Sequence, residues 1–194
     1  FNKRSRLRTI IMSVLDIVHY GNPILKNQCK QFDSFSNIDT ILENMFDSMY
    51  EADGIGLAAN QVGLDMQLFI VDISHTDEAE DVHVFINSSI VKSYDDEEFF
   101  QEGCLSLPGI ALDVLRPKKV ILKYQTPDQK WHEDKFEGLL ARAIQHEIDH
   151  LNGVFIIDRV TKQEKSKYKN DLKSLASKSK QKMADSLKNK GLFL

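Results

Sequence analysis

Residues 137–153 read EGLLARAIQHEIDHLNG, and this stretch decides the fold. Its apolar residues recur at the three- and four-residue spacing of an α-helix and cover a wide part of the surface: Leu139, Leu140, Ala143, Ile144, Ile148 and Leu151. A helix that is apolar over so much of its circumference is normally buried in a core. Gly153 stands where a left-handed residue commonly ends a helix. We therefore predict a buried helix over residues 137–152.

The same stretch carries polar side chains that a core helix does not need, namely His146, Glu147 and His150. Residues four apart lie one turn above each other on one face of a helix, so both imidazoles can reach a single metal ion. Glu147 is close enough to move a proton on a water molecule at that ion. The alternative is a set of polar residues on a core helix, but burying them without partners costs free energy. The pattern therefore favours a catalytic metal site.

A catalytic metal site usually has three protein ligands and an open position, so a third ligand must be found. One class of proteases with this helix motif has a histidine six residues after the second, where this chain has Ile156. Another class uses a downstream glutamate, and here Glu164 lies in a lysine-rich segment. Cys104 is the better candidate, in the tight stretch QEGCLSLPG at residues 101–109 that follows an acidic loop. A lone cysteine is more often a small buried hydrophobe, but the two helical histidines reverse that balance.

A further stretch, GIGLAANQ at residues 54–61, is rich in glycine and alanine. Such small side chains allow another backbone to approach closely, and Gln61 offers an amide donor at the end. Taken alone, the stretch is better explained as a flexible turn after the preceding helix.

The rest of the chain predicts an α+β fold, with mostly antiparallel sheets packed around the central metal-binding helix. Residues 38–51 carry one apolar stripe with helical spacing, capped by Ser36 or Asn37 and followed by Gly54. Five short segments rich in β-branched and aromatic residues are predicted strands: 67–72, 83–87, 90–94, 119–124 and 131–136. A hairpin turn at residues 126–128 joins the last two.

Composition and charge bound the possible functions. The 194 residues suffice for one well-buried domain, and no apolar run reaches the roughly 18 residues of a transmembrane helix. Cys29 and Cys104 show no disulfide-framework spacing, which favours a reducing compartment over the alternative of one disulfide. Residues 161–194 hold ten lysines against three acidic residues, whereas residues 12–160 are acidic. This basic tail is predicted to be a surface helix or partly disordered, and residues 1–12 an N-terminal extension or a cloning remnant.

Together, three of these stretches resemble the peptide deformylases. Residues 54–61, 102–106 and 145–153 match every fixed position of that family's three motifs, in the same order. Additional similarity lies in residues 22–25, 116–117 and 138–142, so the resemblance covers about residues 13–160. Asn60 is a departure, because many relatives have proline there, but the position varies in the family.

The resemblance implies an α+β catalytic domain over residues 13–160 that hydrolyses the formyl amide of formyl-methionyl peptides and releases formate. It implies metal ligation by Cys104, His146 and His150, and proton transfer by Glu147. The Gln61 amide and the Leu105 N–H would stabilise the developing negative charge. The substrate would contact six further residues: Gly54, Ile55, Gly56, Gly103, Leu139 and Ala143.

The resemblance also bears on cofactor, partners and location. The ligand set accepts Fe(II), Zn(II), Ni(II) or Co(II), and family precedent favours Fe(II). Nascent chains are the expected partner, with a possible ribosome contact through residues 161–194 and no membrane association. The expected location is the bacterial cytoplasm, or an organellar stroma or matrix. Two alternatives are a general zinc-dependent peptidase, which has no need of Cys104, and an inactive relative that binds nascent chains or ribosomal RNA.

Overall fold

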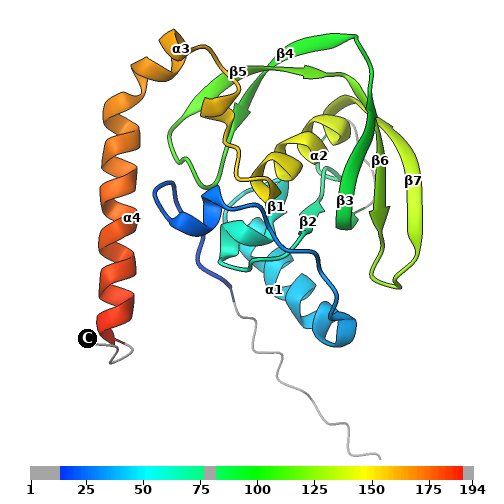
Figure 1. The fold of residues 1–194 in the computed structure, drawn as a ribbon, viewed down its shortest axis with the longest axis horizontal. Coiled ribbons are helices and arrows are strands. Elements are labelled where there is room, and N and C mark those ends of the chain that lie inside the picture. The colour runs from blue at the N-terminus through cyan, green and yellow to red at the C-terminus, as the bar shows by residue number, and fades with distance from the viewer. Residues whose placement is uncertain (1–13, 77–81, 190–194) are drawn as a thin grey trace, which may run out of the picture.

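The computed structural model describes residues 14–76 and 82–189, so the predicted N-terminal extension over residues 1–12 lies outside the described residues. Three features organise the fold: a central helix, a curved sheet around it, and a helical tail along one side (Figure 1). The helices are α1 (Ile38–Glu51), α2 (Gly138–Leu151), α3 (Lys162–Lys167) and α4 (Lys169–Asn189). The strands are β1 (Gly56–Ala58), β2 (Leu68–Val71), β3 (His83–Ser93), β4 (Glu97–Gly103), β5 (Ala111–Pro117), β6 (Lys119–Gln125) and β7 (Trp131–Glu137).

Every strand pairing among the described residues is antiparallel. A five-stranded sheet has the order β1-β2-β3-β6-β7, and a separate ribbon pairs β4 with β5. Register shifts between Ile86 and Ser89 and between Ile90 and Lys92 bend β3, which helps the sheet to curve around α2. The predicted α+β fold, with antiparallel sheets around a central helix, is confirmed.

Helix α2 is buried on almost all sides, as its apolar residues predict, and begins and ends within one residue of the predicted bounds. Its apolar side chains join a core with the inward faces of the large sheet, including Phe69, Phe85 and Val120. Gly153 has φ +71° after the helix end, and a Cβ there would collide with the Lys26 backbone carbonyl. The chain therefore needs glycine at this position both for its conformation and for its packing.

Helix α1 has the predicted bounds and packs its apolar stripe against β1 and β2 through Met45 and Met49. Its capping differs from the prediction. Asn37 occupies the N-cap position without a side-chain hydrogen bond to the helix, and Ser36 lies within a short 3-10 helix, Phe35–Asn37. The cap is weak because that preceding helical turn continues directly into α1.

Three of the five predicted strands are confirmed as β2, β6 and β7, and the turn between the last two is closed by the Thr126 N–H, which donates to the Lys130 carbonyl. The two predicted strands at residues 83–87 and 90–94 are one strand, β3, because a bulge rather than a loop separates them. The prediction of an acidic loop before Cys104 was wrong in part, since the strand β4 already begins at Glu97 and runs to Gly103. The interpretation of residues 54–61 as a flexible turn was also wrong in part, because Gly56–Ala58 is the strand β1.

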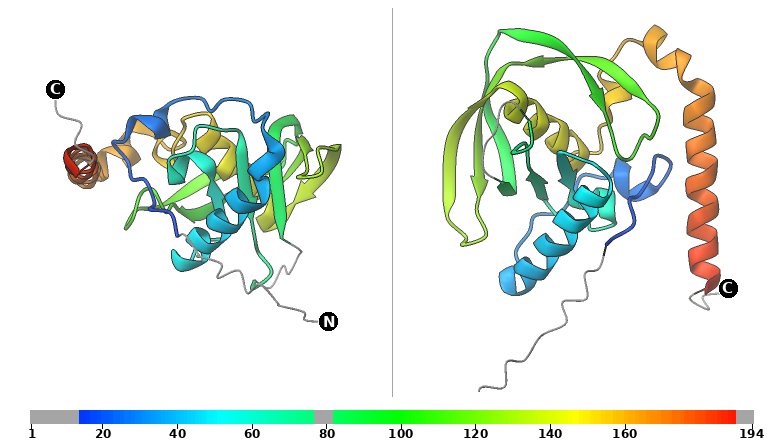
Figure 2. Two further views of the ribbon diagram at one scale, coloured as in Figure 1. Left: turned by 90° about the horizontal axis from the view of Figure 1, so that it is seen from below. Right: turned by 180° about the vertical axis from the view of Figure 1, so that it is seen from behind.

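The basic tail forms α3 and α4, and α4 stands along one side of the molecule in the different views (Figures 1 and 2). Leu172 is buried in a core cluster with residues of the main body, and Ser179 Oγ donates to the His19 carbonyl at 3.2 Å. The tail was predicted to be either a surface helix or partly disordered, and the structure supports a surface helix packed on the domain. Among the described residues, no helix has the length and apolarity needed to cross a membrane. Cys29 and Cys104 are free thiols.

Candidate metal centre

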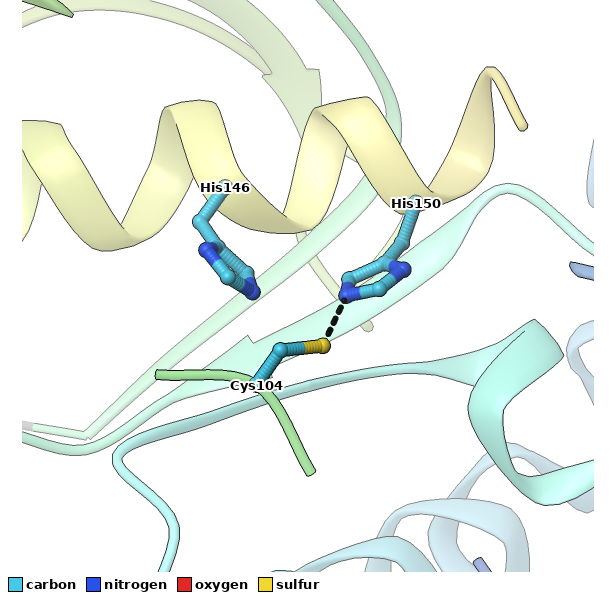
Figure 3. A group of neighbouring side chains, drawn as sticks. All are labelled: Cys104, His146 and His150. Carbon is cyan, nitrogen blue, oxygen red and sulfur yellow. Dashed lines mark hydrogen bonds between the residues drawn. The ribbon is translucent and has the colours of Figure 1, made fainter. Parts of the chain in front are cut away.

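Cys104, His146 and His150 converge on one point although the cysteine is far from the histidines in sequence. Cys104 follows the last residue of β4, and both histidines project from the same face of α2 (Figure 3). Their candidate ligand atoms all lie within 4.8 Å of one another, and Cys104 Sγ is 3.1 Å from His150 Nε2. A thiolate and two imidazoles at these separations are a donor set suited to a transition-metal ion or zinc.

Glu102 fixes the orientation of His146. The Nδ1 atom of His146 lies 3.0 Å from Glu102 Oε2, which leaves Nε2 free to face the other ligand atoms. The same carboxylate accepts two hydrogen bonds from Arg116, at 2.7 and 3.0 Å, and one from Arg142 at 2.8 Å. Burial raises the pKa of Glu102, but its bonds to His146 and Arg116 outweigh this and lower the pKa to about 2. Glu102 is therefore a fixed anion that holds the imidazole in place.

Arg116 connects Glu102 to a second buried carboxylate on α2. Its guanidinium donates to Asp149 Oδ2 at 2.8 Å, and Arg159 also pairs with Asp149. Arg116 and the two carboxylates are nearly inaccessible to solvent. Removing one member would leave an uncompensated charge in the core, so the network ties β4, β5 and α2 together around the ligand set.

Glu147 is buried next to the ligands and faces β1. A Cβ atom built on Gly56 would lie 2.5 Å from Glu147 Oε1, so the carboxylate fills the space that glycine leaves open. Burial is the main cause that raises the pKa of Glu147 to about 7, against the lowering effect of His146. A carboxyl group with a pKa near neutrality can both accept and return a proton.

Gln61 is held with its amide nitrogen toward the cysteine. Its Oε1 accepts from the Ala58 N–H at 2.8 Å, and its Nε2 lies 3.2 Å from Ser106 Oγ and 4.0 Å from Cys104 Sγ. The donor thus lies on the side of the ligand set that carries Cys104.

One cavity of about 350 Å³ brings these groups together. All the predicted site residues except His150 line it, including Leu105 and Gly103 on one wall and Leu139 and Ala143 on another. Gly54, Ile55 and Gly56 form the wall that includes the start of β1. His150 lies behind the ligand set and is 1% exposed. The cavity is therefore open at Glu147, His146 and Cys104 and closed behind His150.

The two histidines differ in electrostatic environment. Burial lowers the pKa of His150, and the charges of His146 and Arg116 lower it further, so this imidazole is neutral and able to ligate. Burial also lowers the pKa of His146, but its bonds to Cys104 and Glu102 outweigh burial and place the pKa well above the usual value. An ion at His146 Nε2 would therefore take the place of a proton.

Several residues that complete the site have no role that their sequence pattern predicts. Glu102, Arg116, Arg142 and Asp149 lie within the motif segments, yet their buried network depends on contacts between distant parts of the chain. Phe100 and Asp53 also line the cavity. The signal that could have revealed the network was charge, since two acids, Glu102 and Asp149, and two arginines, Arg116 and Arg142, lie inside the segments that carry the family resemblance.

A family model described as polypeptide deformylase matches residues 14–166. The chain belongs to the peptide deformylase family. The match ends within α3, so α4 lies beyond it.

Family members of known sequence or structure are similar to this chain over most of their length. The peptide deformylase of Chlorobaculum parvum is 42% identical over 165 residues, which cover 84% of this chain and 88% of that protein. That of Brucella suis is 38% identical over 167 residues, covering 86% and 95%. A plant peptide deformylase structure has a TM-score of 0.82 at 38% identity, covering 88% of this chain and 93% of that one. The Plasmodium falciparum deformylase has a TM-score of 0.79 at 36% identity, covering 85% and 97%.

Proposed function

We propose that this chain removes the formyl group from formyl-methionyl peptides of nascent proteins, using a divalent ion held by Cys104, His146 and His150. The observation that carries the proposal is the convergence of these three ligand atoms within 4.8 Å, with Cys104 and His146 on the wall of a cavity that Glu147 and Gln61 also line. The products are formate and a free amino terminus.

The residues fit an ion on structural grounds. The donor atoms are one soft thiol and two imidazole nitrogens, and Glu102 already occupies the outer nitrogen of His146 at 3.0 Å. A divalent ion bound there would supply Lewis acidity, which would polarise the formyl oxygen and lower the pKa of a bound water molecule. Fe(II) is our proposal for the physiological ion, with Zn(II), Ni(II) and Co(II) as ions that the same donors accept.

Glu147 is the proton carrier. It accepts a proton from the attacking water and returns it to the departing amine, so that the formyl C–N bond breaks without releasing an amide anion. Its burial and its raised pKa of about 7 suit both halves of this task. Its carboxylate faces the cavity wall at Gly56, close to where a substrate backbone would lie.

Gln61 and Leu105 stabilise the negative charge that develops on the formyl oxygen. The Ala58 N–H fixes the Gln61 amide oxygen at 2.8 Å, so the amide nitrogen is oriented as a donor before the substrate arrives. Leu105 follows Cys104 directly and lines the same cavity, which supports its N–H as the second donor.

The substrate backbone pairs with β1. This strand lies at the edge of the large sheet, and Gly54, Ile55 and Gly56 line the cavity, so an extended peptide can add as a further strand whatever its sequence. The methionine side chain enters the apolar wall at Leu139 and Ala143. Bulkier acyl groups and internal peptide bonds are excluded by the narrow cavity, which argues against a general peptidase.

The first test is formate release from formyl-Met-Ala-Ser by protein purified without oxygen. Glu147→Gln should retain the metal and lose roughly 10²–10⁴-fold in kcat, because only the proton carrier is removed. Cys104→Ala should lose both metal and activity. Actinonin, which a similar deformylase from Synechococcus elongatus binds, should inhibit the parent. Cleavage of unformylated internal peptide bonds, or full activity in Cys104→Ala, would contradict the proposal.

We further propose that the lysines of α4 contact ribosomal RNA in the cytoplasm or in an organelle. Lys178, Lys180 and Lys188 are exposed, and Leu172 and Ser179 anchor the helix to the body. Co-sedimentation with ribosomes should weaken with salt and fall when those three lysines become glutamine. Unchanged co-sedimentation of the triple variant would contradict the contact, whereas formate release should be unaffected in either case.

A further inference from the structure

Asn60 is a fully buried polar residue next to Gln61 in the short 3-10 helix Ala59–Val62. It does not line the cavity. Its Nδ2 instead donates to the main-chain carbonyl of His150 at 2.6 Å. Neighbouring side chains thus reach opposite parts of the site, Gln61 to the loop that carries Cys104 and Asn60 to α2.

The carbonyl that Asn60 binds is in the last turn of α2, where helix carbonyls lack the usual partner four residues further on. The Gly153 N–H also donates to it, at 3.1 Å. A carbonyl oxygen can accept two hydrogen bonds, so Asn60 completes its pairing. This bond fixes the backbone position of a metal ligand rather than its side chain.

Two buried polar atoms at this place have no hydrogen-bond partner among the described residues, Asn60 Oδ1 and His150 Nδ1. When His150 ligates through Nε2, its neutral ring carries a proton on Nδ1, so the two atoms are a complementary acceptor and donor. A buried donor and a buried acceptor are costly when unpaired.

From these contacts we infer that Asn60 is a positioning residue for metal binding, which holds His150 against the segment that carries Gln61. The inference rests on the proposed metal site. The ligand set has two halves, one on the Cys104 loop and one on α2, and the Ala59–Val62 turn is bonded to both. Loss of the Asn60 bond to α2 would therefore change the separation between Cys104 and His150, and metal affinity depends on that separation.

The test compares Asn60→Ala with Asn87→Ala, a matched control outside the site. Asn87 is also buried, and its side chain makes three hydrogen bonds, two to Phe32 and one to Gln125. Zn(II) affinity is measured by competition with a chromophoric chelator, alongside the Co(II) absorption spectrum, kcat, KM and the melting temperature. We expect Asn60→Ala to bind Zn(II) roughly 10- to 100-fold more weakly with a lower kcat, the range seen for outer-shell partners of metal ligands. Asn87→Ala should lower the melting temperature but bind Zn(II) as the parent does.

Zn(II) affinity of folded Asn60→Ala within twofold of the parent would overturn the inference, as would an equal loss in Asn87→Ala. If Asn60→Ala does not fold, Asn60→Leu takes its place under the same criteria, because leucine has a similar shape but no hydrogen-bond donor. A parent that binds no Zn(II) would overturn the proposed metal site together with this inference. A parent that binds one Zn(II) while the Asn60 variant is unchanged would overturn the inference alone.

Discussion

Replacing Gly56 by alanine places one methyl group in front of the Glu147 carboxylate. The new Cβ would lie 2.5 Å from Oε1 and within 3.2 Å of two further atoms of the same side chain. β1 is paired with β2 at this residue, so the carboxylate must give way, by about 0.9 Å to reach an ordinary contact of 3.4 Å. A displacement of this size at a reacting group costs on the order of 10²-fold in rate, or about 2.7 kcal/mol in the activation barrier.

The assay is formate release from formyl-Met-Ala-Ser at saturating peptide, together with metal content. Gly56→Ala should keep its metal and lose on the order of 10²-fold in kcat. The loss should vanish in a Glu147→Ala background, because the methyl group acts through that carboxylate. Gly54→Ala is the matched comparison, since its Cβ meets the flexible end of the Leu105 side chain at 2.8 Å and should change KM more than kcat. A Gly56→Ala kcat within threefold of the parent, or full additivity with Glu147→Ala, would refute the reasoning.

Three other outcomes follow from the structure. Glu102→Gln should lower the unfolding free energy at pH 7 by roughly 3–5 kcal/mol, because it leaves buried arginines without their anion. The pKa of Glu102 falls from 4.5 to about 2 on folding, so its contribution to the free energy of unfolding is complete above pH 4.5 and is lost toward pH 2. In urea denaturation, the unfolding free energies of variant and parent should therefore converge as the pH falls through that range. A difference that stays constant with pH would contradict the assignment. Gly153→Ala should unfold at a lower temperature than Gly109→Ala, because both residues have positive φ but only a Cβ at Gly153 strikes the Lys26 carbonyl; equal melting temperatures would contradict this. Dialysis against a chelator should abolish formate release while the circular dichroism spectrum is kept, and Ni(II) should restore it; activity that survives complete metal removal would contradict the metal site.

Local sequence patterns were sufficient for the elements with strong periodicity. The apolar stripe of α1 and the wide apolar surface of α2 gave their bounds within one residue, and β2, β6 and β7 followed from β-branched and aromatic runs. The β4–β5 ribbon was not predicted because apolar residues also lie on its exposed face, so apolar and polar residues do not alternate clearly along the strands. Phe99 is exposed and lies opposite Leu115, and acidic residues surround Phe99 in the sequence. A strand of this kind is specified by its partner rather than by its own residues.

The sequence by itself determined the central helix, the fold class and the chemical identity of the site. Helical spacing places His146 and His150 on one face, and Glu147 beside them, whatever the rest of the chain does. Only the tertiary structure decided how closely Cys104 approaches the histidines, that Gly56 must lack a side chain opposite Glu147, and that Asn60 binds the His150 carbonyl. The physical reason is that periodicity fixes neighbours along one element, whereas contacts between elements depend on how their surfaces pack and on which buried charges must find partners.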